Sequence, residues 1–495
     1  MSKELKKGVL GTWSLAFLTV AALYPMAMGV SNAAAAVSYG GLAAPLILVI
    51  GALLILFMSI PVLEYARLTQ FAGGYYGLAE LGLGRAVGKY VSLLNLIYFV
   101  FFDVLTASAF AFIVYTSLFY LANYTLPSWA FVALSIAVLV ALYAVNTFNL
   151  SVSAKLVVAS GVLQLVVMLV FAAFVIARTP YNTLDAFNPA RAPGGLGGVM
   201  LGTILAGFLF YTGYGVPLFF AEESKAPFRT VWKSIVLGVI VPTLVGIVAV
   251  YSEVVAINPA NAASLASDWN PAVVAYLPYL GLAGALVYLV VALLGQAFGA
   301  FVPGMGSARL IYSMARDKFL DSEWLRRVHP KYGTPANAGL LNLAVGTVAT
   351  LVVELLMFQL YGYHQGVFNS VFLAGSMVVA YWFLHHMIPD VSLAFIYRRF
   401  KVKITNPRNF FVSVVAPAVG LAIFAYSFYE GYSSLTEPYL GGFIFFAITC
   451  VAGALYVWWR ARRNDLGESV VSTKVNDELL RNLTREAAET QRETK

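Results

Sequence analysis

The sequence contains very little charge and a single cysteine. Only 11% of its 495 residues are Asp, Glu, Lys or Arg, less than half of the roughly 25% that soluble domains carry. Cys450 lies within an apolar run, which excludes a disulfide framework and a cysteine-based metal site. Because 60% of the residues are hydrophobic, a soluble fold could not cover this apolar surface, and we expect the chain to lie in a lipid bilayer.

Long apolar runs recur along the whole chain. A helix needs about 20 apolar residues to cross a bilayer, so these runs predict membrane spans rather than buried core helices. The first run follows Lys3, Lys6 and Lys7, as in a signal peptide, but it exceeds an ordinary signal sequence and many similar runs follow. We predict twelve spans, over residues 9–37, 42–63, 91–115, 129–145, 156–177, 198–221, 235–256, 281–303, 336–358, 367–388, 411–429 and 441–459.

The positions of Lys and Arg predict the orientation of these spans. With the N-terminus inside, Arg178 and Arg191 are the only basic residues outside, and the rest lie at cytoplasmic ends, loops or tails. We therefore expect a multi-pass protein of the cell membrane with both termini cytoplasmic. The net charge of +8 then reflects topology, and no nucleic-acid partner is expected. The tail from Asn464 is expected to be disordered or a short surface helix.

Two predicted spans are interrupted by helix-breaking residues. The first contains Pro25 and Gly29, and the sixth contains Gly213, Gly215 and Pro217 within five residues. One such break is usually only a kink, because Gly and Pro are common in membrane helices. Breaks in the first and sixth spans together predict an inverted repeat of five plus five helices.

Unwound backbone within a membrane is tolerated only where it lines a cavity. Free N–H groups at the start of a half-helix attract a carboxylate, and free carbonyl groups at the end of another attract an ammonium group, so the two breaks suit a zwitterion. Spans three, eight and ten are expected to complete the pocket. We expect Gly213 to be the least replaceable residue and Gly202 to tolerate alanine. The candidate substrate-binding residues are Met26, Ala27, Met28, Gly29, Val30, Phe210, Tyr211, Thr212, Gly213, Tyr214 and Gly215.

Three stretches resemble the amino acid–polyamine–organocation (APC) superfamily of amino acid permeases. They are GYGVPLFFAEESKAPFRTVWKSI from Gly213, SARLIYSMARDKFLDSEWLRRVHPKYGTPANA from Ser307, and EYARLTQFAGGYYGLAELGLG from Glu64. The resemblance implies an all-α integral membrane protein with the LeuT-like five-plus-five inverted repeat, discontinuous spans one and six, and two extra C-terminal helices. The implied regions are a cytoplasmic N-terminus (1–8), a transport core (9–400, with repeats at about 9–177 and 198–397), helices eleven and twelve (401–460) and a cytoplasmic tail (461–495).

The resemblance also implies which residues contact the substrate. In the family, a Gly-Ser-Gly sequence in the first helix holds the substrate carboxylate, and the matching residues here are Ala27, Met28 and Gly29. One glycine is replaced and the hydroxyl is lost, which implies a tighter and less polar pocket. The aromatic gate of the sixth helix falls at Leu209, between Phe208 and Phe210.

The family's positions for ion coupling carry no suitable side chain in this sequence. An acid often found two residues after the sixth-helix glycine is Gly215 here, and the fifth-helix lysine of proton-coupled members is Gln164. The eighth-helix hydroxyls of sodium-coupled relatives correspond to Ala297 and Phe298. Gln164 and Ala297 are therefore candidates for ion coupling by position alone. The coupling ion stays unknown, and exchange or facilitated flux are alternatives.

Several ionisable residues lie within or beside the spans. Asp103 is a candidate site for a substrate amine or a proton, and the alternative is a structural acid held by Thr or Ser neighbours. His385, His386 and Asp390 could form an interfacial pair or a proton relay, whereas adjacent histidines are poorly placed for one metal. Glu253 and Glu354 are expected to reach water near outer ends. An ion-pair gate or a solvated rim is expected at the inner mouth, from Glu222, Glu223, Lys225 and Arg229.

Taken together, the sequence predicts a secondary active transporter that moves amino acids across the cell membrane by alternating access. The alternatives are a polyamine or other organic-cation carrier, an amino acid exchanger and, least favoured, a membrane sensor. An enzyme is disfavoured because no nucleophile–base pair or metal cluster occurs at usable spacing. We expect an amino acid as the substrate and no cofactor.

Overall fold

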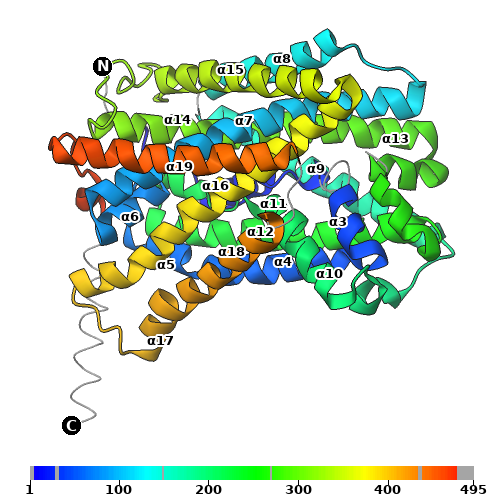
Figure 1. Cartoon of the computed structure of the whole chain (residues 1–495), viewed down its shortest axis with the longest axis horizontal. Coiled ribbons are helices and arrows are strands. Elements are labelled where there is room, and N and C mark those ends of the chain that lie inside the picture. The colour runs from blue at the N-terminus through cyan, green and yellow to red at the C-terminus, as the bar shows by residue number, and fades with distance from the viewer. Residues whose placement is uncertain (1–4, 28–32, 148–149, 268–269, 433–436, 476–495) are drawn as a thin grey trace.

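The computed structural model describes residues 5–27, 33–147, 150–267, 270–432 and 437–475, and the regular structure of these residues is helical, apart from two isolated β-bridges. Within them, ten helices are long and apolar enough to cross a membrane. Each overlaps a predicted span. The sixth predicted span has no such helix, and the first is overlapped only at its end, by the helix Ala35–Met58 that crosses the second. The chain is therefore an all-helical, multi-pass membrane protein (Figure 1).

The helices follow one another with short connections. Their bounds are α1 (Thr12–Ala22), α2 (Pro25–Ala27), α3 (Ala33–Gly40), α4 (Ala44–Met58), α5 (Ile60–Leu68), α6 (Tyr75–Leu83), α7 (Arg85–Ala122), α8 (Ser128–Thr147), α9 (Leu150–Arg178), α10 (Gly195–Gly202), α11 (Phe208–Tyr211), α12 (Pro227–Ala256), α13 (Pro271–Gly299), α14 (Phe301–Arg316), α15 (Ala336–Tyr361), α16 (Tyr363–Arg399), α17 (Pro407–Phe410), α18 (Ala416–Tyr432) and α19 (Tyr439–Arg462).

The outside of the bundle is apolar, unlike the surface of a soluble protein, and its mainly apolar interior also holds polar groups. On α15, Val348 and Val352 are about 60% exposed, and Ile448 and Val451 on α19 are exposed to the same degree. Because lipid tails are as apolar as these side chains, such a surface is stable in a bilayer but not in water. The polar side chains that matter below lie inside the bundle.

The first helical segment ends abruptly in the middle of its apolar run. Helix α1 stops at Ala22, and Tyr24 adopts a left-handed conformation with φ 48°. Pro25 then begins α2. A proline disfavours the α conformation at the residue before it and has no N–H to donate, so it starts a helix more readily than it continues one. Gly29, the other residue of this predicted break, lies outside the described residues.

The sixth segment is interrupted at Thr212 to Gly215. Helix α10 continues through a π-helical stretch (Thr203–Gly207) into α11, which ends at Tyr211. Four turn residues follow, and a 3-10 helix (Val216–Glu223) begins after Gly215. The interruption coincides with the sequence TGYG, where two glycines lower helix propensity by about 1 kcal/mol each.

Most of the basic residues gather at one end of the bundle, here named the basic end. Helix α7 begins at Arg85, and α14, α16 and α19 end at Arg316, Arg399 and Arg462. Figure 1 shows α6 and the C-terminal end of α19 at this end, whereas α3 and α10 lie at the other. Helix α9 ends at Arg178, which places that residue at the opposite end.

The tail was expected to be disordered or a short surface helix. Its described part packs on the bundle and includes a short 3-10 helix (Val471–Lys474), whereas residues 476–495 lie outside the described residues. Gly467 accepts a hydrogen bond from Arg85 (2.9 Å), and the Glu468 N–H donates to Asp317 (2.6 Å). Val471 is fully buried. The segment 465–475 is therefore packed across the basic end, where its backbone binds the start of α7 and the residue after α14.

Candidate functional site

The two helix breaks touch each other. A Cβ atom added to Gly213 would meet the Ala22 carbonyl oxygen and lie 3.0 Å from the Ala22 Cβ. Gly299, at the end of α13, lies just as close to the first break, since a Cβ there would lie 2.7 Å from the Tyr24 ring. Glycine permits this approach of backbone to backbone because it has no side chain. The ends of α1, α11 and α13 therefore converge on one point.

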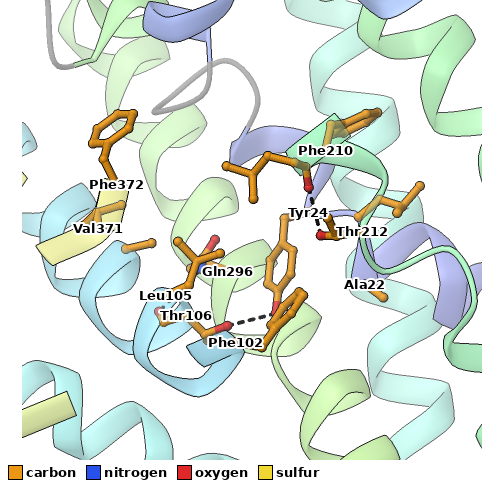
Figure 2. A pocket seen from close by; sticks show the side chains of 13 residues that line it. Ala22, Tyr24, Phe102, Leu105, Thr106, Phe210, Thr212, Gln296, Val371 and Phe372 are labelled. Atoms are coloured by element: carbon orange, nitrogen blue, oxygen red, sulfur yellow. Dashed lines mark hydrogen bonds between the residues drawn. The ribbon is translucent and has the colours of Figure 1, made fainter. Parts of the chain in front are cut away.

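A cavity opens beside this point. It is formed by the end of α1 and residues from α7, α11, α13 and α16, the elements in predicted spans one, three, six, eight and ten. The empty space is about 550 Å³ with the open mouth counted, but only about 40 Å³ of it admits the centres of water-sized molecules, which is room for a few waters. Figure 2 shows its lining, which consists of Ala22, Leu23, Tyr24, Phe102, Leu105, Thr106, Ala109, Leu209, Phe210, Thr212, Gln296, Val371 and Phe372.

Few polar groups face this largely apolar cavity. The Tyr24 hydroxyl lies 3.0 Å from the Thr106 hydroxyl, and the Tyr24 ring stacks on Phe102 at 5.8 Å (Figure 2). Gln296 donates to the Thr106 carbonyl at 3.4 Å, whereas its own Oε1 has no partner among the described residues. A buried amide oxygen without a partner is costly and accepts a hydrogen bond from an entering ammonium or hydroxyl group.

The predicted binding residues occupy different surroundings. Phe210 and Thr212 line the cavity, as does Leu209 at the predicted gate position. Tyr211 points away, with its hydroxyl 3.0 Å from the Leu48 carbonyl. Tyr214 lies against His386 at a ring distance of 5.3 Å.

The other predicted binding residues do not line the cavity or are not described. The Met26 side chain is fully buried in a separate apolar cluster. The space beside Gly215 is filled by the hydroxyl of Tyr75. Ala27 ends α2, and Met28, Gly29 and Val30 lie outside the described residues.

Four residues that line the cavity were not predicted as binding residues from the sequence: Tyr24, Phe102, Thr106 and Gln296. Tyr24 directly precedes Pro25, so the break itself was a signal that its side chain would leave the helix. Phe102 and Thr106 are four residues apart and share one face of α7.

The two possible coupling positions also differ. Gln164 is buried, and its Oε1 accepts a weak hydrogen bond of 3.4 Å from the Met26 N–H. It therefore partners backbone that the break in the first segment leaves free. Ala297 is half-buried on α13 and offers no polar atom.

Asp103 faces away from the cavity, toward α15. Asn342 donates to its Oδ2 at 2.7 Å, and Ser307 donates in turn to Asn342. Gly346 leaves room for the carboxylate, since a Cβ there would lie 2.7 Å from Oδ2. Asp103 thus has an asparagine partner from a distant helix, not the nearby Thr or Ser that the structural alternative supposed.

We expect Asp103→Asn to keep substrate affinity within about twofold, because the side chain does not line the cavity and an amide can still bond to Asn342. Equilibrium binding to purified protein measures this. Thr106→Val, which alters a lining residue on the same helix, serves as the comparison and should weaken binding more. A larger loss of substrate affinity in Asp103→Asn than in Thr106→Val would show that Asp103 belongs to the binding site.

The interfacial interpretation of His385, His386 and Asp390 is wrong. Their side chains are only 1%, 2% and 1% exposed, and they pack against α6, α7 and the break in the sixth segment. Hydropathy predicted that the span ends at residue 388, which placed these three side chains at the membrane surface. Helix α16 instead continues as far as Arg399.

Two further acids are buried where water was expected. Glu253 and Glu354 have no exposed surface. Glu354 accepts a hydrogen bond from Ser108 at 2.8 Å, whereas neither carboxylate oxygen of Glu253 has a partner in the described part of the chain. Their positions near predicted helix ends did not reveal that other helices cover them.

The basic end is closed by two ion pairs that a solvated rim would lack. Glu222 receives two hydrogen bonds of 2.9 Å from Arg316. Glu223 also receives two, from Nε and Nη2 of Arg309, and the second is 2.9 Å long. Burial alone would raise the pKa of the Glu222 carboxyl, but the hydrogen bonds and charge of Arg316 lower that pKa below its ordinary value. The acids thus pair with residues of α14, not with the neighbouring Lys225 and Arg229.

The N-terminal segment adds to this closure. The Val9 N–H donates to the Glu223 carbonyl and the Lys225 N–H donates to the Leu10 carbonyl, both at 2.8 Å. The chain before α1 therefore pairs with the end of the sixth segment. The end of the sixth segment is therefore held to the N-terminal segment by these hydrogen bonds and to α14 by the two ion pairs.

Comparison with known proteins agrees with this architecture. The chain is 31% identical over 220 residues to an uncharacterized transporter of Mycobacterium tuberculosis, covering 44% of this chain and 47% of that relative. It is 29% identical over 166 residues to the glutamate/serine transporter AimA of Bacillus subtilis (32% and 30%). It is 26% identical over 314 residues to the low-affinity putrescine importer PlaP of Escherichia coli (61% and 64%).

These matches span between about a third and two thirds of the length of each relative. The match to a family model is much longer. The model described as amino acid permease covers residues 10–471, nearly the whole chain and all of its helices. The chain belongs to the amino acid permease family.

Proposed function

We propose that this protein is a secondary active transporter that moves amino acids across the cell membrane by alternating access. The observation that carries the proposal is the contact between Gly213 and Ala22, which joins two helix breaks beside a largely apolar cavity that would widen to admit a substrate. Membership of the permease family supports it. A polyamine carrier is the second candidate, favoured by the similarity to a putrescine importer and by the unpartnered Gln296 oxygen.

The proposed topology has twelve spans, with the segments containing α1 and α11 as discontinuous spans one and six. The first repeat covers about 9–177 and the second about 198–397, and two C-terminal helices follow. The basic end is cytoplasmic, with residues 1–8 and 461–495 on that side. The concentration of Arg and Lys at this end supports the orientation.

In the proposed binding mode, a zwitterion lies between the two breaks. Its carboxylate is held by backbone N–H groups from Ala27 onward, at the start of the second half of span one, because the Met26 N–H already donates to Gln164. Its ammonium group is held by Gln296 Oε1 and by the second lone pair of the Thr212 carbonyl, whose first accepts from Tyr98. Phe210 and Phe102 cover the apolar part of the substrate.

Alternating access then requires the basic end to open. In the closed form, Glu222–Arg316 and Glu223–Arg309 tie the sixth segment to α14. Opening must separate these pairs and release the N-terminal segment from Glu223 and Lys225. Since separating buried ions costs several kcal/mol, we propose that contacts with the bound substrate offset part of this cost.

Thermal unfolding of purified protein with candidate ligands tests the proposed function. A ligand present at 100 times its Kd stabilises the folded state by about 2.7 kcal/mol, so a true substrate raises Tm measurably. The probes are L-serine, L-glutamate and putrescine, followed by the remaining amino acids. Gln296→Ala should abolish the Tm increase. If no amino acid or amine raises Tm, the proposal fails, and if putrescine alone does, the second candidate replaces the first.

Cysteine labelling tests the proposed orientation. In a Cys450→Ser background, Asn261→Cys should react with a membrane-impermeant maleimide added to intact cells, and Lys331→Cys should react only after lysis. Both positions are exposed, so whether each cysteine reacts depends only on the side of the membrane on which it lies. The reverse pattern would contradict the topology.

A further inference from the structure

A second group of polar side chains is buried between the cavity and the basic end. His385 and His386 of α16 meet tyrosines from three other parts of the chain. The His386 ring lies 4.0 Å from that of Tyr75 on α6 and 5.3 Å from that of Tyr214 at the break. The His385 ring lies 4.8 Å from that of Tyr98 on α7. The usual coupling positions of the family are elsewhere, so the cluster has no role in the site described above.

His386 and Asp390 have unmet hydrogen-bonding capacity. His386 Nδ1 and Asp390 Oδ1 lack partners within the described part of the chain, whereas His385 Nδ1 lies 2.7 Å from the Tyr381 carbonyl. The two residues are four positions apart and share one face of α16. Their ionisable and charged neighbours are His385 on the same helix and the three tyrosines, and no ion pair to Asp390 occurs among the described residues.

One proton changes the net charge of this pair in a simple way. With one proton on either member, the pair is neutral overall, but without it a carboxylate is left buried and uncompensated. An uncompensated buried charge costs several kcal/mol, so such a pair binds and releases a proton when its surroundings change. Buried His and acidic residues in membrane bundles commonly serve as proton relays.

The break in the sixth segment connects this pair to the cavity. The Tyr98 hydroxyl donates to the Thr212 carbonyl at 2.9 Å, and Thr212 lines the cavity. On the other side of the break, the Tyr75 hydroxyl fills the space beside Gly215. Tyr75 and Tyr98 therefore both contact the break, so a change in the break alters the surroundings of the two histidines.

We propose that His386 and Asp390 together form a proton-binding site, and that the protein carries this proton along with its substrate. The proton binds when the basic end is closed and leaves when the 3-10 helix moves to open it. The coupling to transport rests on the proposed function, whereas proton binding itself does not.

Proteoliposomes containing a pH-sensitive dye test the coupling, with L-serine, L-glutamate and putrescine as probes. In the wild type, entry of a transported probe should acidify the lumen, and an inward proton gradient should raise uptake at least tenfold. Asp390→Asn and His386→Gln should lose both effects and still exchange the probe across the membrane. His385→Gln, whose wild-type ring is held by backbone, should keep both. Proton uptake by Asp390→Asn equal to the wild type would overturn the proposal.

Tryptophan fluorescence tests proton binding without transport. The Trp382 ring lies 4.6 Å from the His386 ring, so gain or loss of charge on the His386–Asp390 pair changes the indole emission, whichever member holds the proton. Emission between pH 5 and 9 should therefore show a single titration that Trp382→Phe and His386→Gln each remove and His385→Gln retains. A titration unchanged by His386→Gln would overturn the site. If the wild type moves none of the probes but the titration is present, the proposed function fails and the proton site stands.

Discussion

Gly213→Ala is expected to weaken substrate binding by at least about 100-fold while the protein still inserts and folds. The added methyl group would meet the Ala22 carbonyl, so α1 and the sixth segment must move apart at the edge of the cavity. Alanine also favours continued helix by up to about 1 kcal/mol, which opposes the turn at TGYG. Equilibrium binding of the ligand found by thermal unfolding measures the loss.

The control for this variant comes from the structure. The expectation that Gly202 tolerates alanine is wrong, because a Cβ there would lie 2.5 Å from Ile47 and 2.6 Å from Tyr39. Gly246 on α12 is the better control, since its nearest neighbour would be Leu48 at 3.9 Å. Gly246→Ala should bind as the wild type does. Equal binding by Gly213→Ala and the wild type would mean that the break is only a kink.

Arg309→Met is expected to lower the free energy of unfolding by about 3–5 kcal/mol, because it leaves Glu223 buried without its partner. Arg309 and Glu223 are only 2% and 1% exposed. The double variant Arg309→Met/Glu223→Gln removes both charges and should recover most of this loss. Unfolding of the purified protein in detergent, followed by tryptophan fluorescence, gives the values.

An exposed ion pair provides the comparison. Arg191 lies 2.6 Å from Asp185, with both side chains about half exposed, and such pairs contribute at most about 1 kcal/mol. Arg191→Met should therefore leave stability nearly unchanged. If Arg309→Met is no more harmful than Arg191→Met, or if the double variant is as unstable as the single one, the buried pair does not hold the basic end closed.

The sequence predicted the positions of the two helix breaks because their cause is local. Pro25 and the glycines of TGYG act on their own backbone, so their effect can be derived without knowing any neighbour. The apolar spans follow from the same kind of reasoning. The cavity residues Phe210 and Thr212 were found because they flank a break.

The remaining features depend on contacts between distant parts of the chain. Gln296 reaches the cavity only because α13 packs beside α7, and Glu222 pairs with a residue 94 positions away. Asp103 is an acid in an apolar run by sequence, but its partner, Asn342, lies 239 positions along. No local pattern predicts such partners, and for the same reason the burial of His386 and Asp390 was missed.

The most direct test of the account is a structure of the protein with its ligand. The ligand is the amino acid or amine that raises Tm most, added at saturating concentration. The account predicts density for it between Tyr24, Thr212 and Gln296, with its charged ends at the two helix breaks. Density elsewhere in the bundle, with the contact between Gly213 and Ala22 intact and the cavity free of ligand, would contradict the claim that the breaks form the substrate site.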